Sequence, residues 1–289
     1  MSFKDMLLSG KFTITGELAP SKGSDPAHIG DTLKWLSGCV DAVNVTDNQR
    51  ACVKASSLAV SKMVLERGME PIYQLTCRDR NRIALQSDLL GANMLGVRNV
   101  LALTGDHVSF GDHPTAQQVF DLDSARLVVA IRGLNEGHDM EGNHLEGKTD
   151  FLIGAVLNPG AMDLEVEVMR TERKVSAGAQ FFQTQLVYDA DAFKSLMKEL
   201  PKGVRVLAGI APLKSKRMAE FMNAKVPGVR VPKGMISELD RAKDPAEAGL
   251  KQAADIIREL RPHCSGIHVM AFGAEGRVRP LLELAGMLK

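Results

Sequence analysis

Eight short apolar segments, separated by helical patterns, constrain the fold of this chain more than any other feature. Each segment is rich in β-branched or aliphatic residues and ends near Gly, Pro, Asp or Asn, as strands do. Several are too apolar to alternate between a buried and a solvated face, which is typical of parallel strands covered by helices. The predicted strands are Phe12–Leu18, Val40–Thr46, Pro71–Cys77, Asn99–Thr104, Phe151–Leu157, Phe181–Leu186, Arg205–Ile210 and Gly266–Phe272.

The stretches between these strands carry the three- and four-residue spacing of helices. The clearest apolar stripe runs from Leu250 to Leu260, and another runs from Phe193 to Leu200 and starts at Asp191. Strand and helix patterns alternate eight times, and no break in composition divides the chain. We therefore expect an α/β fold with one domain over residues 1–289, a (β/α)₈ TIM barrel. An open doubly wound sheet has the same alternation and is the alternative.

Composition excludes several classes of protein. The chain has 36 Lys and Arg against 35 Asp and Glu, a net charge of +1, so we expect no nucleic-acid or membrane partner. No stretch is long and apolar enough for a membrane-spanning helix, and the first ten residues are too polar for a signal peptide. The histidines form no HxH or HExxH pair, so no metal site is predicted. We expect a cytoplasmic protein with reduced thiols at Cys39, Cys52, Cys77 and Cys264.

One segment matches a nucleotide-binding motif by its letters alone. Gly142–Thr149 fits the P-loop pattern GxxxxGK[ST], which requires a strand before it and a helix N-terminus after it. Here a polar stretch precedes the segment and a predicted strand follows within two residues. We therefore predict a loop or short hairpin that turns on Gly142 and Gly147 and binds no nucleoside triphosphate.

In a (β/α)₈ barrel the active site lies at the carboxyl ends of the strands. Glu17 ends the first predicted strand between apolar neighbours, an environment that favours a protonated carboxyl and suits a general acid; a solvated loop carboxylate is the alternative. Asp106 follows Gly105 at another strand end and suits a ligand contact or a helix cap. Arg173 and Lys174 on a helix favour a solvated basic face over a phosphate site, and His268 is interpreted as a core residue. Other polar residues at strand ends are Thr46, Asp47, Asn48, Gln74, Thr76, Thr104, Asn158, Gln183 and Gln185.

Seven short motifs, each weak alone, occur in one order along nearly the whole chain. In this combination the chain resembles the methylenetetrahydrofolate reductase family of flavin-containing barrels, and in particular the short catalytic subunits of anaerobic bacteria. The motifs are Thr15-Gly-Glu-Leu-Ala-Pro20, Val43-Asn-Val-Thr46, Gln74-Leu-Thr-Cys77, Ala102-Leu-Thr-Gly-Asp106, Arg173-Lys-Val-Ser-Ala-Gly-Ala179, Thr184-Gln185 and Gly209-Ile-Ala-Pro212.

The resemblance implies an activity and a role for each matching residue. The activity is flavin-dependent reduction of 5,10-methylenetetrahydrofolate to 5-methyltetrahydrofolate, with FAD favoured over FMN. Glu17 would be the general acid that protonates the bridging nitrogen of the folate, Asp106 would tune the flavin and bind the pterin, and Gln185 would bind folate. Besides Asp106, the flavin-binding residues would be Thr46, Gln74, Thr104, Gly105, Phe120, Asp121, Asn158, Arg173 and Lys174.

Four positions depart from the better-known bacterial members of that family. Thr104 and Ala274 replace arginines, Gln74 replaces a histidine, and Lys216 takes the place of an aromatic residue that stacks on substrates. A lysine offers no flat apolar face for stacking. We therefore expect poor use of NADH or NADPH by this chain alone, and an iron–sulfur or flavin partner subunit that delivers electrons within an oligomer. The alternative is that Phe221, or a residue from elsewhere in the chain, takes over the stacking.

Two other functions are compatible with such a barrel. One is a methyltransferase that uses methyltetrahydrofolate with a corrinoid protein and needs no flavin. The other is a non-catalytic scaffold subunit, which would have no use for Glu17, Asp106 and Gln185 together.

Overall fold

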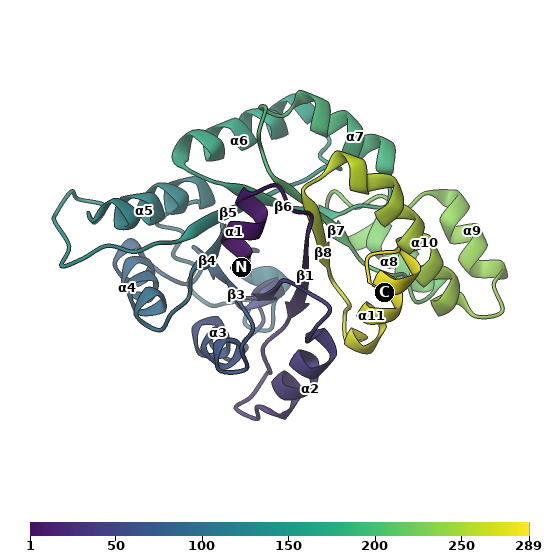
Figure 1. The fold of residues 1–289 in the computed structure, drawn as a ribbon, viewed down its shortest axis with the longest axis horizontal. Coiled ribbons are helices and arrows are strands. Elements are labelled where there is room, and N and C mark those ends of the chain that lie inside the picture. Colours follow the sequence, from purple (N-terminus) through teal and green to yellow (C-terminus); the bar gives the residue numbers. More distant parts are fainter. Residues whose placement is uncertain (289) are drawn as a thin grey trace.

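The computed structural model describes residues 1–288, in which eight parallel strands close into a barrel with helices outside it (Figure 1). Each strand pairs with the next along the chain, and β8 pairs with β1. The predicted TIM barrel is thereby confirmed, and an open sheet is excluded. The strands are β1 (Thr13–Leu18), β2 (Ala42–Val45), β3 (Pro71–Thr76), β4 (Asn99–Leu103), β5 (Leu152–Leu157), β6 (Phe181–Leu186), β7 (Val206–Ile210) and β8 (Gly266–Val269).

The predicted strands are all present, with small differences at their ends. The largest is in β8, which ends at Val269 rather than at Phe272. Phe272 has a φ of 48°, in the left-handed region, and an extended strand cannot continue through that conformation.

Eleven α-helices are present in residues 1–288, and several begin at an acidic or amide cap. The helix predicted to start at Asp191 starts one residue earlier, because the Asp189 carboxylate accepts hydrogen bonds from the N–H groups of Asp191 and Ala192. The helices are α1 (Phe3–Leu8), α2 (Ala27–Leu36), α3 (Ser57–Glu66), α4 (Arg82–Met94), α5 (Ser124–Glu136), α6 (Leu164–Ala177), α7 (Ala190–Glu199), α8 (Lys216–Lys225), α9 (Lys233–Arg241), α10 (Pro245–Leu260) and α11 (Val278–Leu284).

The interior of the barrel is apolar at one end and polar at the other. At the amino ends of the strands, α1 lies across the opening (Figure 1), and the Phe3 ring packs edge-on against Phe181 with 5.9 Å between ring centroids. These two residues and Leu7 form an inner core separate from the larger one between sheet and helices. The other inner-core residues are Ala42, Ile72, Leu101, Leu152 and Leu207. Two residues further along several of these strands the inward side chains are polar, so a site is built at the carboxyl ends.

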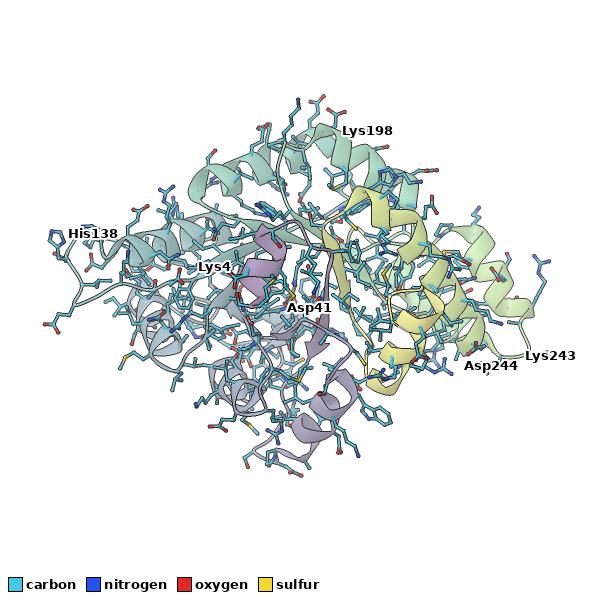
Figure 2. The ribbon with its side chains drawn as sticks, viewed as in Figure 1. Lys4, Asp41, His138, Lys198, Lys243 and Asp244 are labelled. Carbon is cyan, nitrogen blue, oxygen red and sulfur yellow. The ribbon has the colours of Figure 1, made fainter. Side chains whose placement is uncertain are left out.

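The segment with the P-loop pattern forms a hairpin. His138 and His144 make an antiparallel bridge, and Gly142 and Gly147 have φ values of 86° and 97°. The hairpin projects from the periphery of the barrel, where Figure 2 labels His138, and β5 follows it directly. The predicted hairpin is confirmed, and no helix N-terminus follows the Gly-Lys-Thr sequence to receive a phosphate.

No helix in residues 1–288 is long and apolar enough to cross a membrane. Within the same residues the four cysteines are free thiols.

Candidate active site

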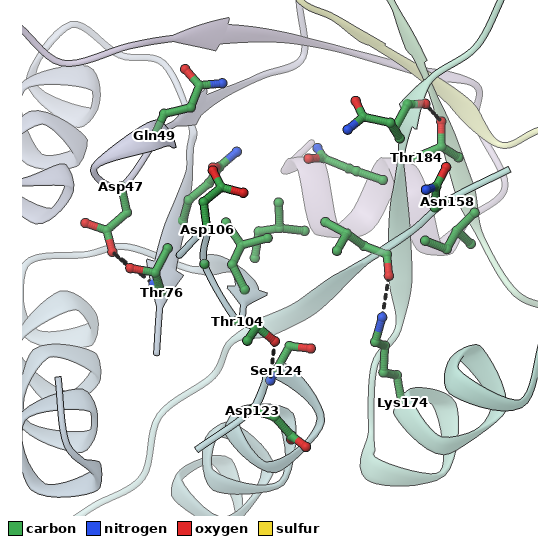
Figure 3. A pocket seen from close by; sticks show the side chains of 18 of the residues that line it. Asp47, Gln49, Thr76, Thr104, Asp106, Asp123, Ser124, Asn158, Lys174 and Thr184 are labelled. Atoms are coloured by element: carbon green, nitrogen blue, oxygen red, sulfur yellow. Dashed lines mark hydrogen bonds between the residues drawn. The ribbon is translucent and has the colours of Figure 1, made fainter. Parts of the chain in front are cut away.

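A cavity of about 640 Å³ opens at the carboxyl ends of the strands, opposite α1 (Figure 3). Residues from seven of the eight strands or the loops that follow them line it, although they are far apart in the sequence. The predicted site residues in its wall are Glu17, Gln74, Thr104, Gly105, Asp106, Asn158, Arg173, Lys174 and Gln185. The structure therefore brings most of the predicted site together.

Three predicted flavin-binding residues are not in this wall. Thr46 follows β2 and is buried. Phe120 is half-buried with a φ of 42°, and Asp121 is engaged elsewhere. The Asp121 carboxylate accepts hydrogen bonds from the backbone N–H and the guanidinium of Arg82 at 2.9–3.0 Å, which lowers its pKa to about 2. It thus ties the loop before α5 to the start of α4.

Glu17 lies within β1 rather than in a loop, and its side chain is only 10% exposed. The alternative of a solvated loop carboxylate is therefore wrong. His268 on the adjacent strand β8 lies beside it, with 3.6 Å between Nε2 and the Glu17 carboxylate. His268 was expected to be only a core residue, but it lines the cavity as well as being buried. The pairing of β8 with β1, which local sequence does not specify, makes this contact.

Asp106 follows β4, is exposed to the cavity, and caps no helix. His107 caps the short 3₁₀ turn that follows, because its ring accepts a hydrogen bond from the Ser109 N–H. The helix-cap alternative for Asp106 is therefore wrong. Gly105 has a φ of 94°, and a Cβ there would lie 3.2 Å from the Thr76 side chain, so glycine lets this turn pack closely against β3.

A buried ionic network fixes the rim at β2 and β3. The Asp47 carboxylate accepts hydrogen bonds from the backbone and hydroxyl of Thr76 at 2.9 and 2.8 Å (Figure 3). It also pairs with Arg80 at 2.8 Å. Arg78, which the sequence analysis missed, is buried beside it and donates to the carbonyls of Asn48 and Asp106 at 3.2 and 3.3 Å. These bonds hold three rim segments in one arrangement. A run of charged residues after a strand was the signal that could have identified Arg78.

On the opposite wall, Lys174 of α6 points into the barrel. Its Nζ donates to the Val156 carbonyl at 2.6 Å (Figure 3), and burial lowers its pKa. The interpretation of a solvated basic face is therefore wrong for Lys174. Arg173 is exposed and pairs with Asp123 at 3.2 Å, as that interpretation expects, although it also lines the cavity.

An irregularity in β6 positions the glutamines. The register with β7 shifts between Gln183 and Leu186, as in a bulge, and the Thr184 hydroxyl accepts a hydrogen bond from the Gly209 N–H at 2.8 Å. Gln183 is 3% exposed, and its amide nitrogen Nε2 has no hydrogen-bond partner in the protein. Gln183 and Gln185 both line the cavity.

Of the four residues that depart from the bacterial pattern, Gln74 and Thr104 line the cavity, whereas Lys216 and Ala274 lie outside its wall. Lys216 is the first residue of α8, and its Nζ pairs with Asp240 of α9 at 3.0 Å. Ala274 lines a small separate apolar hollow between the β7 loop and α11. Across the described part of the chain, no three His, Cys, Asp or Glu side chains are grouped as metal ligands would be.

Comparisons with known proteins give the same assignment as the motifs. The family model described as methylenetetrahydrofolate reductase matches residues 2–286. A probable methylenetetrahydrofolate reductase (NADPH) of Caenorhabditis elegans is 25% identical over 276 residues, and the match covers 92% of this chain and 39% of that protein. A 5,10-methylenetetrahydrofolate reductase of Pectobacterium carotovorum is 24% identical over 262 residues, covering 88% of this chain and 81% of the relative.

Solved structures share the fold at low identity. An uncharacterized protein from Clostridium thermocellum, which binds two copies of 5-methyl-5,6,7,8-tetrahydrofolic acid, superposes with a TM-score of 0.69 and 17% identity, covering 98% of this chain and 97% of that one. The chain spans less than two fifths of the length of the first eukaryotic relatives, such as 36% of methylenetetrahydrofolate reductase 1 of Schizosaccharomyces pombe. Because the family match extends over residues 2–286, the chain belongs to the methylenetetrahydrofolate reductase family.

Proposed function

We propose that this chain reduces 5,10-methylenetetrahydrofolate to 5-methyltetrahydrofolate with a bound flavin, FAD rather than FMN. One observation carries the proposal: Glu17, Asp106 and Gln185, which come from three different parts of the barrel, line the same cavity as six of the candidate flavin-binding residues. The Clostridium thermocellum protein with the same fold binds the product of this reaction, which supports a folate ligand here.

The cavity suits a flavin by its size and by its polar groups. Its volume falls within the roughly 300–1,000 Å³ that small-molecule sites occupy. The buried Gln183 amide has a donor nitrogen without a protein partner, and such a group is normally satisfied by a ligand or water. A ring with carbonyl oxygens, as flavins and pterins have, supplies that acceptor. When bound, the flavin supplies hydride chemistry.

Residues of the chain donate the proton and orient the folate. Glu17 gives its carboxyl proton to the bridging nitrogen, the bond from that nitrogen to the methylene carbon breaks, and the carbon remains as an iminium that accepts hydride. The position of Glu17 suits this role, because its side chain is only 10% exposed and lines the cavity in which the folate would lie. Gln185 and Asp106 bind the folate from the β6 and β4 sides of the cavity.

The proposal is tested with the purified protein. We expect a yellow protein with a flavin absorption spectrum, release of FAD on denaturation as identified by mass spectrometry, and formation of 5-methyltetrahydrofolate with a reduced viologen dye. The variant Glu17→Gln is expected to keep reducible flavin and to lose about 10²–10⁴-fold in turnover. Glu66→Gln, at an exposed position of α3, is the control that should leave turnover unchanged. Near-normal turnover by Glu17→Gln would remove Glu17 from the mechanism.

The same preparation separates the other two functions. A colourless protein that binds methyltetrahydrofolate and shows no redox activity would favour the corrinoid-dependent methyltransferase. A protein that binds neither flavin nor folate would favour a scaffold.

We also propose that electrons reach this chain from an iron–sulfur or flavin partner subunit in an oligomer. The observation is that Lys216 is held by Asp240, and that Phe221, the first aromatic residue after β7, is 47% exposed on α8 and outside the cavity wall. Rapid mixing of the isolated protein with NADH or NADPH tests this. Flavin reduction at the rate of turnover would contradict the proposal, whereas reduction by a viologen dye alone agrees with it.

The four free thiols suit a reducing, cytoplasmic location.

A further inference from the structure

His268 of β8 is buried and lies beside Glu17 of the neighbouring strand β1. Its side chain is 4% exposed, and its Nε2 lies 3.6 Å from the Glu17 carboxylate. This distance is slightly longer than a hydrogen bond, as is common in catalytic pairs before the substrate binds. The question for the chemistry is which ring nitrogen of His268 carries the proton.

The other ring nitrogen, Nδ1, faces the Asn44 amide and the Thr15 hydroxyl. The Asn44 amide nitrogen lies 3.2 Å from Nδ1, and the Thr15 hydroxyl lies 3.0 Å from it. A hydroxyl can donate or accept, and that of Thr15 also donates to the Ile267 carbonyl at 3.5 Å, so Asn44 sets the direction at Nδ1. Asn44 presents its NH₂ group to the ring because its Oδ1 accepts a hydrogen bond from the Gln74 Nε2 at 3.4 Å. Nδ1 is therefore an acceptor, and in the neutral ring the proton is on Nε2, which faces Glu17.

We propose that His268 is a positioning residue for Glu17: as the neutral Nε2–H tautomer, it stabilises the Glu17 carboxylate that remains after proton donation. This rests on the proposed function, in which Glu17 gives its proton to the folate nitrogen. The product carboxylate is poorly hydrated in this site, and a buried charge without a donor is costly. The Nε2–H supplies that donor. His268 neither gains nor loses a proton in the cycle, and water in the cavity reprotonates Glu17.

The geometry also explains why four strands contribute to this arrangement. Thr15 and Glu17 lie on β1, Asn44 on β2, Gln74 on β3 and His268 on β8, and all four strands are neighbours in the closed barrel. In the register of the sheet, Thr15 is opposite His268 and Glu17 is opposite Asn44. The ring is thus held from both sides, so its tautomer and its direction are fixed together.

Two substitutions of His268 distinguish the roles of its two ring nitrogens. In His268→Gln the side-chain amide reaches the Nε2 position and keeps a donor toward Glu17, whereas in His268→Asn the amide stays near Nδ1 and Glu17 loses its donor. Because a hydrogen bond to a charged group contributes about 1.5–3 kcal/mol, we expect kcat to fall about 10- to 100-fold in His268→Asn with little change in KM. His268→Gln should recover most of that loss. A purely structural role predicts equal losses in both, and that result would overturn the proposal.

A measurement on the ring itself does not depend on turnover. In protein labelled with ¹⁵N-histidine, the His268 signals are identified by their absence in His268→Gln. We expect a protonated Nε2 and an unprotonated Nδ1 at neutral pH, and a change in the Nε2 resonance in Glu17→Gln. A protonated Nδ1, or an Nε2 resonance unaffected by Glu17→Gln, would refute the proposal. A wild-type protein that reduces no methylenetetrahydrofolate would refute the proposed function instead, and the ring measurement would still determine the tautomer.

Discussion

Truncating Phe3 to alanine is expected to destabilise the barrel strongly without altering the site. The Phe3 side chain is fully buried in the inner core and contacts Phe181 edge-on at 5.9 Å between ring centroids. Replacing a buried Phe by Ala costs about 3–5 kcal/mol, through lost transfer free energy and the cavity left behind. A protein of ordinary stability has about 5–15 kcal/mol in total, so Phe3→Ala removes a large part of the free energy of unfolding.

The measurement is equilibrium unfolding in urea, followed by far-UV circular dichroism. Leu8→Ala is the matched control, because Leu8 lies on the same helix α1 but is 37% exposed and outside both cores; we expect it to change the free energy of unfolding by less than about 1 kcal/mol. The affinity for the proposed flavin should not change in Phe3→Ala, since the cavity lies at the other end of the barrel. A loss of less than about 1 kcal/mol in Phe3→Ala would refute the assignment of α1 as the closure of the barrel.

Three further predictions concern single side chains. Burial lowers the pKa of Lys174, so the charged lysine destabilises the folded state at neutral pH, and this destabilisation declines as the pH rises toward the unfolded pKa of 10.5. In urea unfolding, the free energy of unfolding of the wild type should therefore rise relative to that of Lys174→Met between pH 7 and pH 9.5. A constant difference between the two proteins would contradict this. Burial raises the pKa of Cys77 to about 12, so its thiol should resist alkylation at pH 8 under conditions that modify the half-buried Cys52. Peptide mass spectrometry measures the modification of each cysteine, and equal modification of the two would contradict the buried position of Cys77. The Gly142–Thr149 hairpin should bind no ATP in calorimetry, and micromolar binding abolished by Lys148→Ala would show the hairpin interpretation to be wrong.

The amino-acid sequence determined the order of elements and the end of the barrel that carries the site. Strand and helix signals are local, because they depend on side-chain periodicity and on caps such as Asp189, so eight strands could be located within a few residues. Parallel strands share one direction, so residues that end different strands meet at one opening. For this reason Glu17, Asp106 and Gln185 could be expected in one cavity before any contact was known.

Only the tertiary structure decided which side chains touch inside that cavity. His268 contacts Glu17 through the pairing of the last strand with the first, a contact between residues 251 positions apart that no local pattern encodes. Lys174 and Arg173 are adjacent on one helix and both line the cavity, yet Lys174 reaches the Val156 carbonyl whereas Arg173 is exposed and pairs with Asp123, since the rotation of α6 is set by packing against the sheet. Asp121 pairs with Arg82 and does not line the cavity. These outcomes depend on closure, register and helix packing, which are collective properties of the whole chain.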